Sequence, residues 1–239
     1  MRSRKSNVLK NSENLEKLEG ALGYSFHDRA LLQLALTHTS YANEHKEEGA
    51  GDNERLEFLG DAVLETICSE YLYRRHPEKN EGGLSMLRAS IVCEPTLALC
   101  AHDFDLSDYL ILGNGENQSG GRYRDSIVSD AMEAVIGAVY LDGGFEAAER
   151  FISMHILKDI GEKQLFVDSK TNLQEIVQAE EKQINYVLVR EEGPDHDKIF
   201  TMEAVIDGET AGVGTGRTKK AAEQHAAFEA IKKLRGKID

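Results

Sequence analysis

The sequence of 239 residues contains no apolar run that approaches the length of a membrane-spanning helix. Its first seven residues are basic but lack the apolar stretch of a secretory signal, so we expect a basic arm there. Only three cysteines are present, and they form no C-x-x-C pair. Because Cys68, Cys93 and Cys100 lie in apolar helical pattern, we expect reduced core residues in a cytoplasmic protein without a membrane anchor.

Positive charge is also scarce, with 28 Lys and Arg against 42 Asp and Glu and a net charge of −14. Taken alone, this balance argues against nucleic acid as a partner, because phosphates attract cations. The charge is unevenly distributed, however. Residues 1–168 carry a net −12, residues 169–239 a net −2, and residues 217–239 a net +4. This distribution predicts a metal-loading part followed by a smaller, phosphate-gripping part.

The most informative stretch is N-E-R-L-E-F-L-G-D, residues 53–61. Read as a helix, it places Glu54, Glu57 and Asp61 within about 60° of one another. The opposite face is apolar and consists of Leu56, Leu59, Val63 and Ile67. Acidic residues at this spacing are ordinarily a solvated face, since exposed carboxylates are common. Phe58 lies on the acidic side, however, where a solvated helix has no use for an aromatic ring.

A second predicted helix further along the chain repeats this design. Asp130 and Glu133 lie one turn apart on one face with Gly137 beneath them, and the other face is apolar. If the two helices cross with Gly137 at the contact, both acidic pairs converge, including Glu57 and Asp61. Four carboxylates in a small volume either have raised pKa values or bind a hard divalent cation. An all-oxygen site with room for water suits Mg²⁺ or Mn²⁺.

The remainder of the first 160 residues shows helical periodicity and no convincing strand, which predicts an all-α domain. Further helices are expected at 15–22, 29–36, 84–93, from Pro95 onward, and 145–160. Glu81 is placed in a loop with Gly82 and Gly83. Residues 112–124 are glycine-rich but lack the G-K-[ST] ending of a nucleotide loop, so their expected role is to deliver the second acidic pair. We expect His38 to be a hydrogen-bonded structural residue rather than a ligand.

The pattern changes after Gly161. Residues 163–168 form a short polar linker, and a helix is predicted over 171–181. Three strands follow at 185–192, 199–206 and 209–215, and the Asp207-Gly208 pair between the last two is a strong hairpin turn. A final helix over 219–234 turns small and apolar residues toward the sheet. The order α-β-β-β-α predicts a small α+β domain.

Together these motifs resemble those of the ribonuclease III family. The matching segments are residues 53–61, His38 to Tyr41, Glu81-Gly82, Gly120 to Arg122, Asp130 to Ala134 and Tyr140 to Gly144. The last ~70 residues resemble the double-stranded-RNA-binding domain of that family, with motifs at 193–196 and 214–223. The resemblance covers nearly the whole chain. It implies a catalytic domain at 13–162, a linker at 163–168 and an RNA-binding domain at 169–238.

This resemblance implies a homodimeric endonuclease that cuts double-stranded RNA, leaves 5′-phosphate and 3′-hydroxyl ends with short 3′ overhangs, and processes ribosomal RNA precursors and other structured transcripts. By motif position, the ligands of catalytic Mg²⁺, for which Mn²⁺ substitutes, are Glu57, Asp61, Asp130 and Glu133. Asp61 and Glu133 are the catalytic residues among them. Glu54 and Glu81 have supporting roles, and Phe58 lies in the subunit interface.

In the second domain, the resemblance assigns RNA contacts to Thr171, Gln174, Gln178, His196, Lys219 and Lys220. Amides and a histidine can reach 2′-hydroxyls across the shallow minor groove, while lysines at a helix N-terminus attract phosphates. Thr218 stands where the family usually has serine, and it keeps the hydroxyl for capping.

Two other functions compete with this interpretation. A non-catalytic double-stranded-RNA-binding protein would keep the second domain, but it would not need all four carboxylates. A metal-dependent hydrolase of small nucleotides would explain the carboxylates but not the second domain. The lysine pair alone could also be a solvated face.

Overall fold

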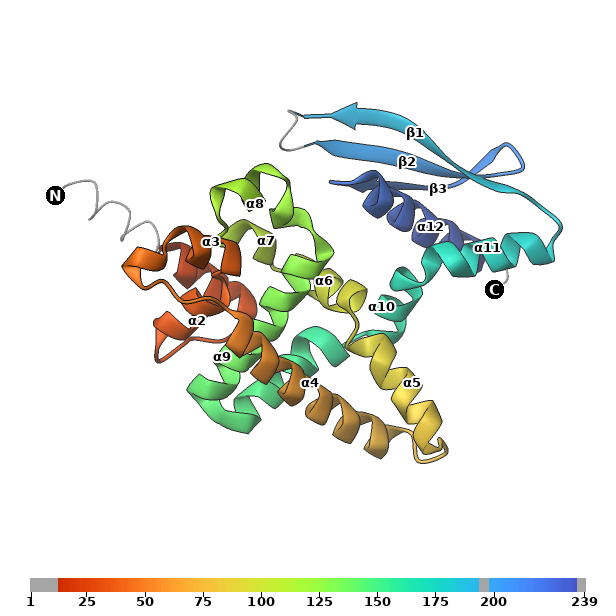
Figure 1. The fold of residues 1–239 in the computed structure, drawn as a ribbon. Helices are drawn as coiled ribbons and strands as arrows, with labels where there is room; N and C mark the ends of the chain where they lie inside the picture. Colours follow the sequence, from red (N-terminus) through yellow and green to blue (C-terminus); the bar gives the residue numbers. More distant parts are fainter. Residues whose placement is uncertain (1–12, 194–197, 236–239) are drawn as a thin grey trace. The chain divides into compact units, whose positions relative to one another are not determined.

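The computed structural model describes residues 13–193 and 198–235. The chain forms two compact units that divide between Ile160 and Gly161 (Figure 1). Each unit has its own hydrophobic core. The first unit is helical and the second combines helices with a sheet, which confirms both predicted fold classes.

Helices account for the architecture of the first unit. Residues 13–22 form the first helix, and it is followed by α2 (Arg29–Ala35), α3 (Thr39–Glu44), α4 (Glu54–Arg75), α5 (Glu81–Ile91), α6 (Glu94–His102), α7 (Leu106–Tyr109), α8 (Asn114–Gln118) and α9 (Asp125–Ile152). Short turns lie at η1 (Lys46–Glu48) and η2 (Gly121–Tyr123), and the π-helical η3 (Ser153–Leu157) ends the unit. Within the described residues of this unit, the pairing of Thr37 with Ile111 is an isolated bridge rather than a strand.

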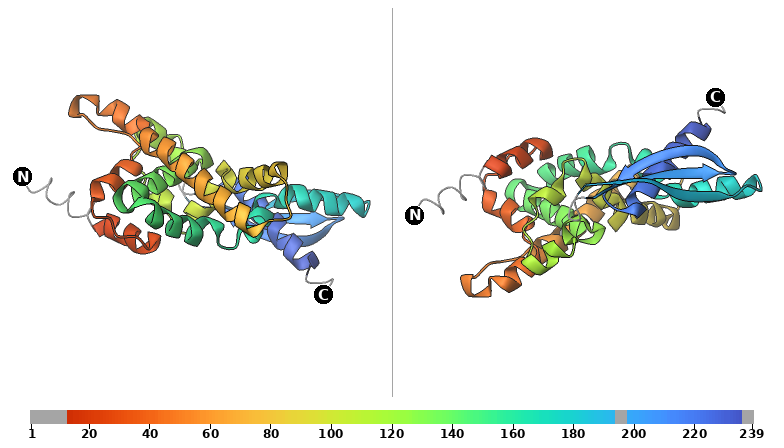
Figure 2. Two further views of the ribbon diagram at one scale, coloured as in Figure 1. Left: turned by 90° about the horizontal axis from the view of Figure 1, so that it is seen from below. Right: turned by 90° about the horizontal axis from the view of Figure 1, so that it is seen from above.

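The core of the first unit is built around the crossing of α4 and α9, which the left view of Figure 2 shows. The predicted apolar face of α4 is buried at Leu56, Val63 and Ile67, while Leu59 packs at its margin. On α9 the predicted face is buried as well, at Met132, Val135, Ile136 and Val139. The carboxylates of the two helices lie beside this crossing, where Glu57, Asp130 and Glu133 are half-buried and Asp61 is exposed.

Two predicted boundaries in the first unit are wrong. Glu81 does not lie in a loop, because it is the first residue of α5, and Gly82 and Gly83 form the first turn of that helix. The Asn80 side chain caps this turn by accepting a hydrogen bond from the Gly83 amide at 3.0 Å. Glycines are tolerated there because the first amides of a helix have no intrahelical partner. The helix predicted over 145–160 does begin after a non-helical break at Gly144 within α9, but the α-helix ends at Ile152 and is followed by the π-helical η3.

The second unit consists of α10 (Ile160–Val167), α11 (Ser169–Ala179), β1 (Ile184–Glu192), β2 (Ile199–Ile206), β3 (Glu209–Gly216) and α12 (Lys219–Arg235). Its sheet is antiparallel in the order β1-β2-β3. Asp207 and Gly208 both have positive φ between paired Ile206 and Glu209, as a two-residue hairpin turn requires. The predicted hairpin is confirmed.

Close packing of α12 on β3 explains the alternating glycines of that strand. A Cβ atom at Gly214 would lie 2.2 Å from the Ala226 amide nitrogen, and one at Gly212 would lie 2.3 Å from the Ala226 carbonyl oxygen. The α12 residues that face the sheet are small and fully buried, including Ala222 and Ala230. Helix and strand backbones therefore touch with almost no side chain between them.

The predicted linker, residues 163–168, is mostly helical, because α10 occupies it up to Val167. Polar composition suggested a linker, but Leu165 packs against the core of the second unit. Contacts with residues far along the chain are not visible in local periodicity.

Three further expectations concern a membrane span, the cysteines and the basic N-terminal arm. Within the described ranges, no single helix is long and apolar enough to cross a membrane. Helices α5 and α6 taken together, with a bend of 44° between them, have the length and composition of a span. The three cysteines are free; Cys68 and Cys100 are buried, and Cys93 is half-buried at the start of α6. The predicted basic arm lies outside the described residues.

Candidate active site

The crossing point of α4 and α9 is made by two glycines. A Cβ atom at Gly60 would lie 1.8 Å from the Glu133 carbonyl oxygen, and one at Gly137 would lie 2.3 Å from the Leu56 carbonyl oxygen. No other residue type could occupy either position without moving a backbone. Sequence reasoning identified Gly137 as the point of close approach but missed its partner Gly60. The contact fixes the two acidic faces against each other.

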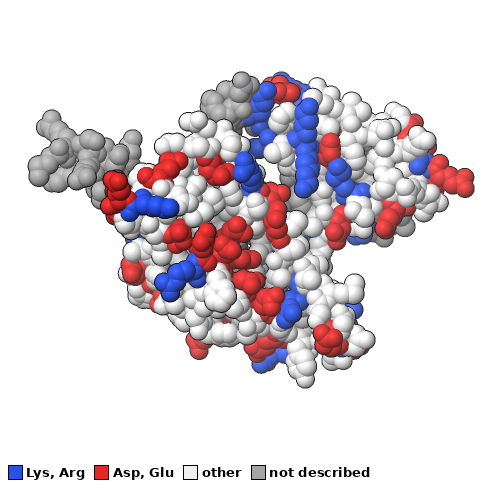
Figure 3. Space-filling model, in the orientation of Figure 1, with Lys and Arg blue, Asp and Glu red and all other residues white. Residues whose placement is uncertain are grey.

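Glu57, Asp61, Asp130 and Glu133 share one neighbourhood at this crossing. Burial raises the pKa of Glu133 to about 8, and the charges of Asp61, Asp130 and Glu57 add to the rise. Burial also raises the pKa of Glu57, followed by the charges of Asp130, Glu54 and Asp61. Glu54 therefore lies near the group, as predicted. Figure 3 shows Asp and Glu side chains gathered over this crossing.

The four carboxylates form a neighbourhood rather than a finished coordination shell. Within the described part of the chain, no three His, Cys, Asp or Glu side chains are placed to hold one ion. The chemistry of the donor set nevertheless fits a hard divalent cation, because all four groups are carboxylates, and burial with nearby negative charges disfavours the ionised forms of Glu57, Asp130 and Glu133. Asp61 is exposed, which leaves room for water ligands.

Two residues that the sequence did not assign to the site flank Asp130. Burial raises the pKa of Asp130 and the charge of Glu94 raises it further, whereas the charge of His38 lowers it. Glu94 begins α6 and is separated in sequence from both acidic helices, so no spacing rule indicated it. His38 has the expected structural role, since its ring nitrogen caps α3 by accepting from the Ser40 amide at 3.2 Å.

Side chains of α3 accept hydrogen bonds from the segment that leads into α9. The Glu44 carboxylate accepts hydrogen bonds from the backbone and side-chain nitrogens of Asn114, both at 3.0 Å, at the start of α8. The Ser40 hydroxyl accepts from the Gly113 amide at 2.9 Å. Arg124, the residue before α9, forms an ion pair of 2.6 Å with Glu116. The predicted loop is therefore a braced segment with two short helices, and it leads directly to the second acidic pair.

Asp142 anchors the other end of the acidic part of α9. Its side chain is 2% exposed, and it accepts hydrogen bonds from the Tyr24 hydroxyl and from the His27 and Asp28 amides at 2.8–2.9 Å. A Cβ atom at Gly143 would lie 2.4 Å from the Tyr24 hydroxyl. The Tyr140 to Gly144 motif is thus a structural joint between α9 and the chain before α2.

The structure does not bring Glu81 to the other carboxylates within one chain. Glu81 follows the far end of α4, and Arg75 at that end lies about 27 Å along the helix from Glu57 at 1.5 Å per residue. Its carboxylate instead accepts a hydrogen bond from the Ser85 hydroxyl at 2.8 Å. Phe58 is 79% exposed, as predicted for a ring with no core of its own to enter.

The residues predicted to contact RNA lie on exposed surfaces of the second unit. Thr171, Gln174 and Gln178 share the exposed face of α11, opposite the buried Leu173 and Val177. Lys219 and Lys220 are exposed in the first turn of α12, and the Thr218 hydroxyl accepts from the Ala221 amide at 3.1 Å. His196 lies outside the described residues. The second unit thus presents amides on one helix and cations at the start of another.

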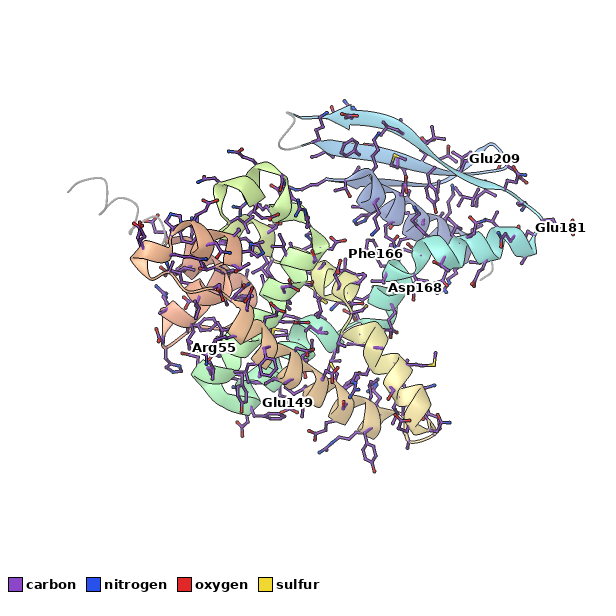
Figure 4. The ribbon with its side chains drawn as sticks, in the orientation of Figure 1. Arg55, Glu149, Phe166, Asp168, Glu181 and Glu209 are labelled. Atoms are coloured by element: carbon purple, nitrogen blue, oxygen red, sulfur yellow. The ribbon has the colours of Figure 1, made fainter. Side chains whose placement is uncertain are left out.

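Two pockets in the described part of the chain lie away from the four carboxylates. One cavity of about 380 Å³ lies between the second half of α4 and the end of α9, where Glu149 contributes to its wall (Figure 4). Another of about 380 Å³ lies beside the β2–β3 turn and α12. None of the four carboxylates lines them. An open acidic surface suits a wide polymer better than a small ligand, which would be largely enclosed.

Comparisons with known proteins agree with this division of the chain. Residues 28–160 match the family described as Ribonuclease-III-like, and residues 169–234 match the double-stranded RNA binding motif. Ribonuclease 3 of Caldanaerobacter subterraneus subsp. tengcongensis is 51% identical over 225 residues, 92% of this chain and 98% of that protein. Ribonuclease 3 of Oceanobacillus iheyensis is 48% identical over 91% of this chain and 97% of its own length.

Among solved structures, the nuclease domain of ribonuclease III from Campylobacter jejuni is 43% identical, with a TM-score of 0.57, and covers 61% of this chain and 97% of that one. That structure was described for flexibility in a region involved in dimer formation of the domain. The helical unit with its two acidic helices, the second unit and the extent of these matches lead to one conclusion: the chain belongs to the ribonuclease III family of endoribonucleases.

Proposed function

We propose that this protein cleaves double-stranded RNA endonucleolytically at the crossing of α4 and α9, with Mg²⁺ bound by Glu57, Asp61, Asp130 and Glu133. The observation that carries the proposal is the mutual charge coupling of these carboxylates in a chain whose second unit matches a double-stranded RNA binding motif. Mn²⁺ would substitute, because it accepts the same oxygen donors.

Each part of the chain has a distinct task in this reaction. The carboxylates hold the ion against α4 and α9, whose relative position is fixed at Gly60 and Gly137. Mg²⁺ held by these carboxylates would lower the pKa of a water and stabilise charge on the leaving 3′ oxygen; addition of that water to phosphorus with cleavage of the P–O3′ bond gives a 5′-phosphate and, once the 3′ oxygen takes up a proton, a 3′-hydroxyl. The exposed face of α11 and the first turn of α12 hold the duplex by its minor-groove hydroxyls and its phosphates. Because these contacts read shape more than bases, structured transcripts as a class, ribosomal RNA precursors among them, are the expected substrates in the cytoplasm.

We further propose that the active form is a homodimer. Phe58, Tyr73 and Met86 are 79%, 73% and 77% exposed on α4 and α5, and single chains seldom leave several large apolar side chains so exposed on neighbouring helices. One site gives one cut, whereas severing both strands of a duplex, with ends offset as a short 3′ overhang, needs two sites related by a two-fold axis. A role for Glu81 at the site would then come from the second copy.

The function is tested by Glu133→Gln, which keeps the shape of the side chain but removes its charge. We expect cleavage of a long RNA duplex in Mg²⁺ to fall by at least about a hundredfold, while duplex binding is retained. Glu149→Gln, on the same helix α9 but away from the crossing, is the matched control and should cleave normally.

Near-normal turnover of Glu133→Gln at saturating Mg²⁺ would overturn the site assignment. Absence of cleavage by the unaltered protein with either Mg²⁺ or Mn²⁺, together with tight duplex binding, would favour the alternative of a non-catalytic RNA-binding protein.

A further inference from the structure

Helix α10 is attached to α12 of the second unit by an aromatic contact. The Phe166 ring lies 4.7 Å from the His225 ring and 5.3 Å from the Phe228 ring, centroid to centroid, with edge-on geometry at both. Figure 4 labels Phe166 at the end of α10. Leu165 packs against the core of the same unit. Two consecutive side chains of α10 thus contact the rest of the second unit.

Gln224 joins the same helix end through polar contacts. Its side-chain nitrogen donates to the Phe166 carbonyl at 2.5 Å and also to the Val167 carbonyl. These are the last carbonyls of α10, which have no partner within the helix. The Gln224 carbonyl in turn accepts from the Ser169 hydroxyl at 3.0 Å, and Ser169 is fully buried. One glutamine of α12 therefore binds the end of α10 and the start of α11.

Only Asp168 separates α10 from α11. Its amide donates to the Gln164 carbonyl at 3.0 Å, and its carbonyl accepts from the Asn172 amide at 2.8 Å, so hydrogen bonding continues across the junction. The exposed face of α11, which begins with Thr171, starts within one turn of this junction. Any tilt of α10 relative to α12 is therefore passed on to the helix that presents Thr171.

The backbone features of a joint lie before α10 rather than in the predicted linker. Lys158 is extended, and Asp159 has a φ of +54°, a left-handed conformation. Ile160 packs against the core of the first unit, and Gly161 has open space where a Cβ would be. The division between the units falls between these last two residues.

We propose that Phe166 and Gln224 are positioning residues, which lock α10, the first helix of the second unit, to α12 and thereby orient the RNA-contacting face of α11. The joint between the units is then confined to residues 158–161, and residues 163–168 are not a flexible linker. A shorter joint raises the effective concentration of the second unit at a duplex held by the first. This last consequence rests on the proposed function, whereas the attachment of α10 does not.

Amide hydrogen exchange of the full-length protein tests the attachment directly. In the unaltered chain, amides of residues 164–168 should exchange at least about tenfold more slowly than an unstructured peptide, because they lie in a packed helix. Phe166→Ala should lower their protection by about tenfold, and Gln224→Ala should act in the same direction. Phe166→Tyr, which keeps the ring, should retain protection, as should Glu162→Ala on the exposed side of α10.

Cleavage kinetics then test the positioning role. Phe166→Ala should raise KM for a duplex substrate by about threefold to tenfold at physiological salt and leave kcat unchanged, and Phe166→Tyr should restore KM. Unprotected amides in the unaltered chain, or full protection in Phe166→Ala, would overturn the attachment whether or not the protein cleaves RNA. Lowered protection with an unchanged KM would overturn the positioning role alone. If Phe166→Ala unfolds the second unit, Gln224→Ala and the unaltered chain still decide between these outcomes.

Discussion

In both units glycines allow two backbones to touch, but the charged groups near the two contacts differ. In the first unit, Gly60 and Gly137 let two helices touch; in the second, Gly212 and Gly214 let a helix touch a strand. The first contact gathers like charges in a partly buried place and raises the pKa of Glu133 to about 8. The second holds a helix whose cations remain exposed to solvent.

This difference shows where function lowers stability. Partly buried carboxylates without cationic partners destabilise the folded state, and an ion that binds them restores stability. Lys219 and Lys220 of α12 are exposed, so they lose little hydration in the fold and can attract phosphates over a Debye length of about 8 Å at physiological salt. The first unit is therefore expected to gain stability from Mg²⁺, whereas the second is not.

The largest expected effect is that of Gly60→Ala. The added methyl group would lie 1.8 Å from a backbone oxygen of α9, so the two helices must separate. We expect a loss of about 3 kcal/mol or more in the stability of the first unit, with loss of cleavage. Thermal unfolding followed by circular dichroism measures the first quantity.

Gly20→Ala is the matched control for that substitution. Gly20 is an exposed helical residue of the same unit with nothing within 4 Å of an added Cβ, so its replacement should be neutral or stabilising by up to about 1 kcal/mol. Equal stability of the two variants would contradict the close crossing.

Sequence pattern predicted these two contacts unequally. The period of three and four residues placed Glu57 and Glu133 on the correct helix faces, because a helix face depends only on local geometry. β2 was placed to the residue by its alternation and by the Asp207-Gly208 turn. The pattern could not identify Gly60 as the partner of Gly137, because that contact joins segments more than 70 residues apart in the chain.

Most of the remaining misses have the same cause, whereas the one at Gly82 and Gly83 is a local signal that was overlooked. Glu94 acts on Asp130 by its charge and Glu44 accepts hydrogen bonds from Asn114, and nothing in their local sequence distinguishes them from surface carboxylates. Residues 163–168 were interpreted as a linker from polarity, although Phe166 has aromatic partners on α12. Gly82 and Gly83 suggested a loop because the cap supplied by Asn80 was not recognised. Local chemistry predicts elements and faces, but not which distant groups meet.

The glycine contact in the second unit predicts that RNA binding can be weakened without loss of cleavage. Gly214→Ala would place a methyl group 2.2 Å from the Ala226 amide nitrogen, so α12 must move off the sheet. We expect a loss of about 2 kcal/mol, confined to the second unit, and weaker duplex binding at physiological salt. Cleavage at low salt and high Mg²⁺ should persist, because the carboxylates are untouched. Val213→Ala, at the exposed neighbouring position, is the control. If Gly214→Ala lost cleavage both at physiological salt and at low salt with high Mg²⁺, the two units would not be separable in function.

Assembly distinguishes the units further, since the first leaves Phe58 exposed. We expect Phe58→Asp to weaken the dimer by at least about tenfold, because it puts a charge into an apolar contact, and to impair double-strand cutting. Sedimentation equilibrium at micromolar protein measures the association. Phe145→Asp, at an exposed aromatic after the kink of α9, should not change it. A monomeric unaltered protein would rule out this role of Phe58.

The smallest effect concerns Asp142, a carboxylate of the first unit that is stabilised where Glu133 is not. Burial alone would raise the pKa of Asp142, but hydrogen bonds from the Asp28 and His27 amides and from Tyr24 outweigh it and lower the pKa to about 2. A lowered pKa contributes stability that is full above the unfolded value near 4 and is lost as the pH falls to about 2. Asp142→Asn should therefore cost about 1 kcal/mol at pH 7, allowing for solvent screening, and progressively less below pH 4. Urea unfolding at pH 7 and pH 3 measures this, with Glu146→Gln, exposed on the same helix, as the control. A cost that is the same at both pH values would show that Asp142 acts through its shape and not through its charge.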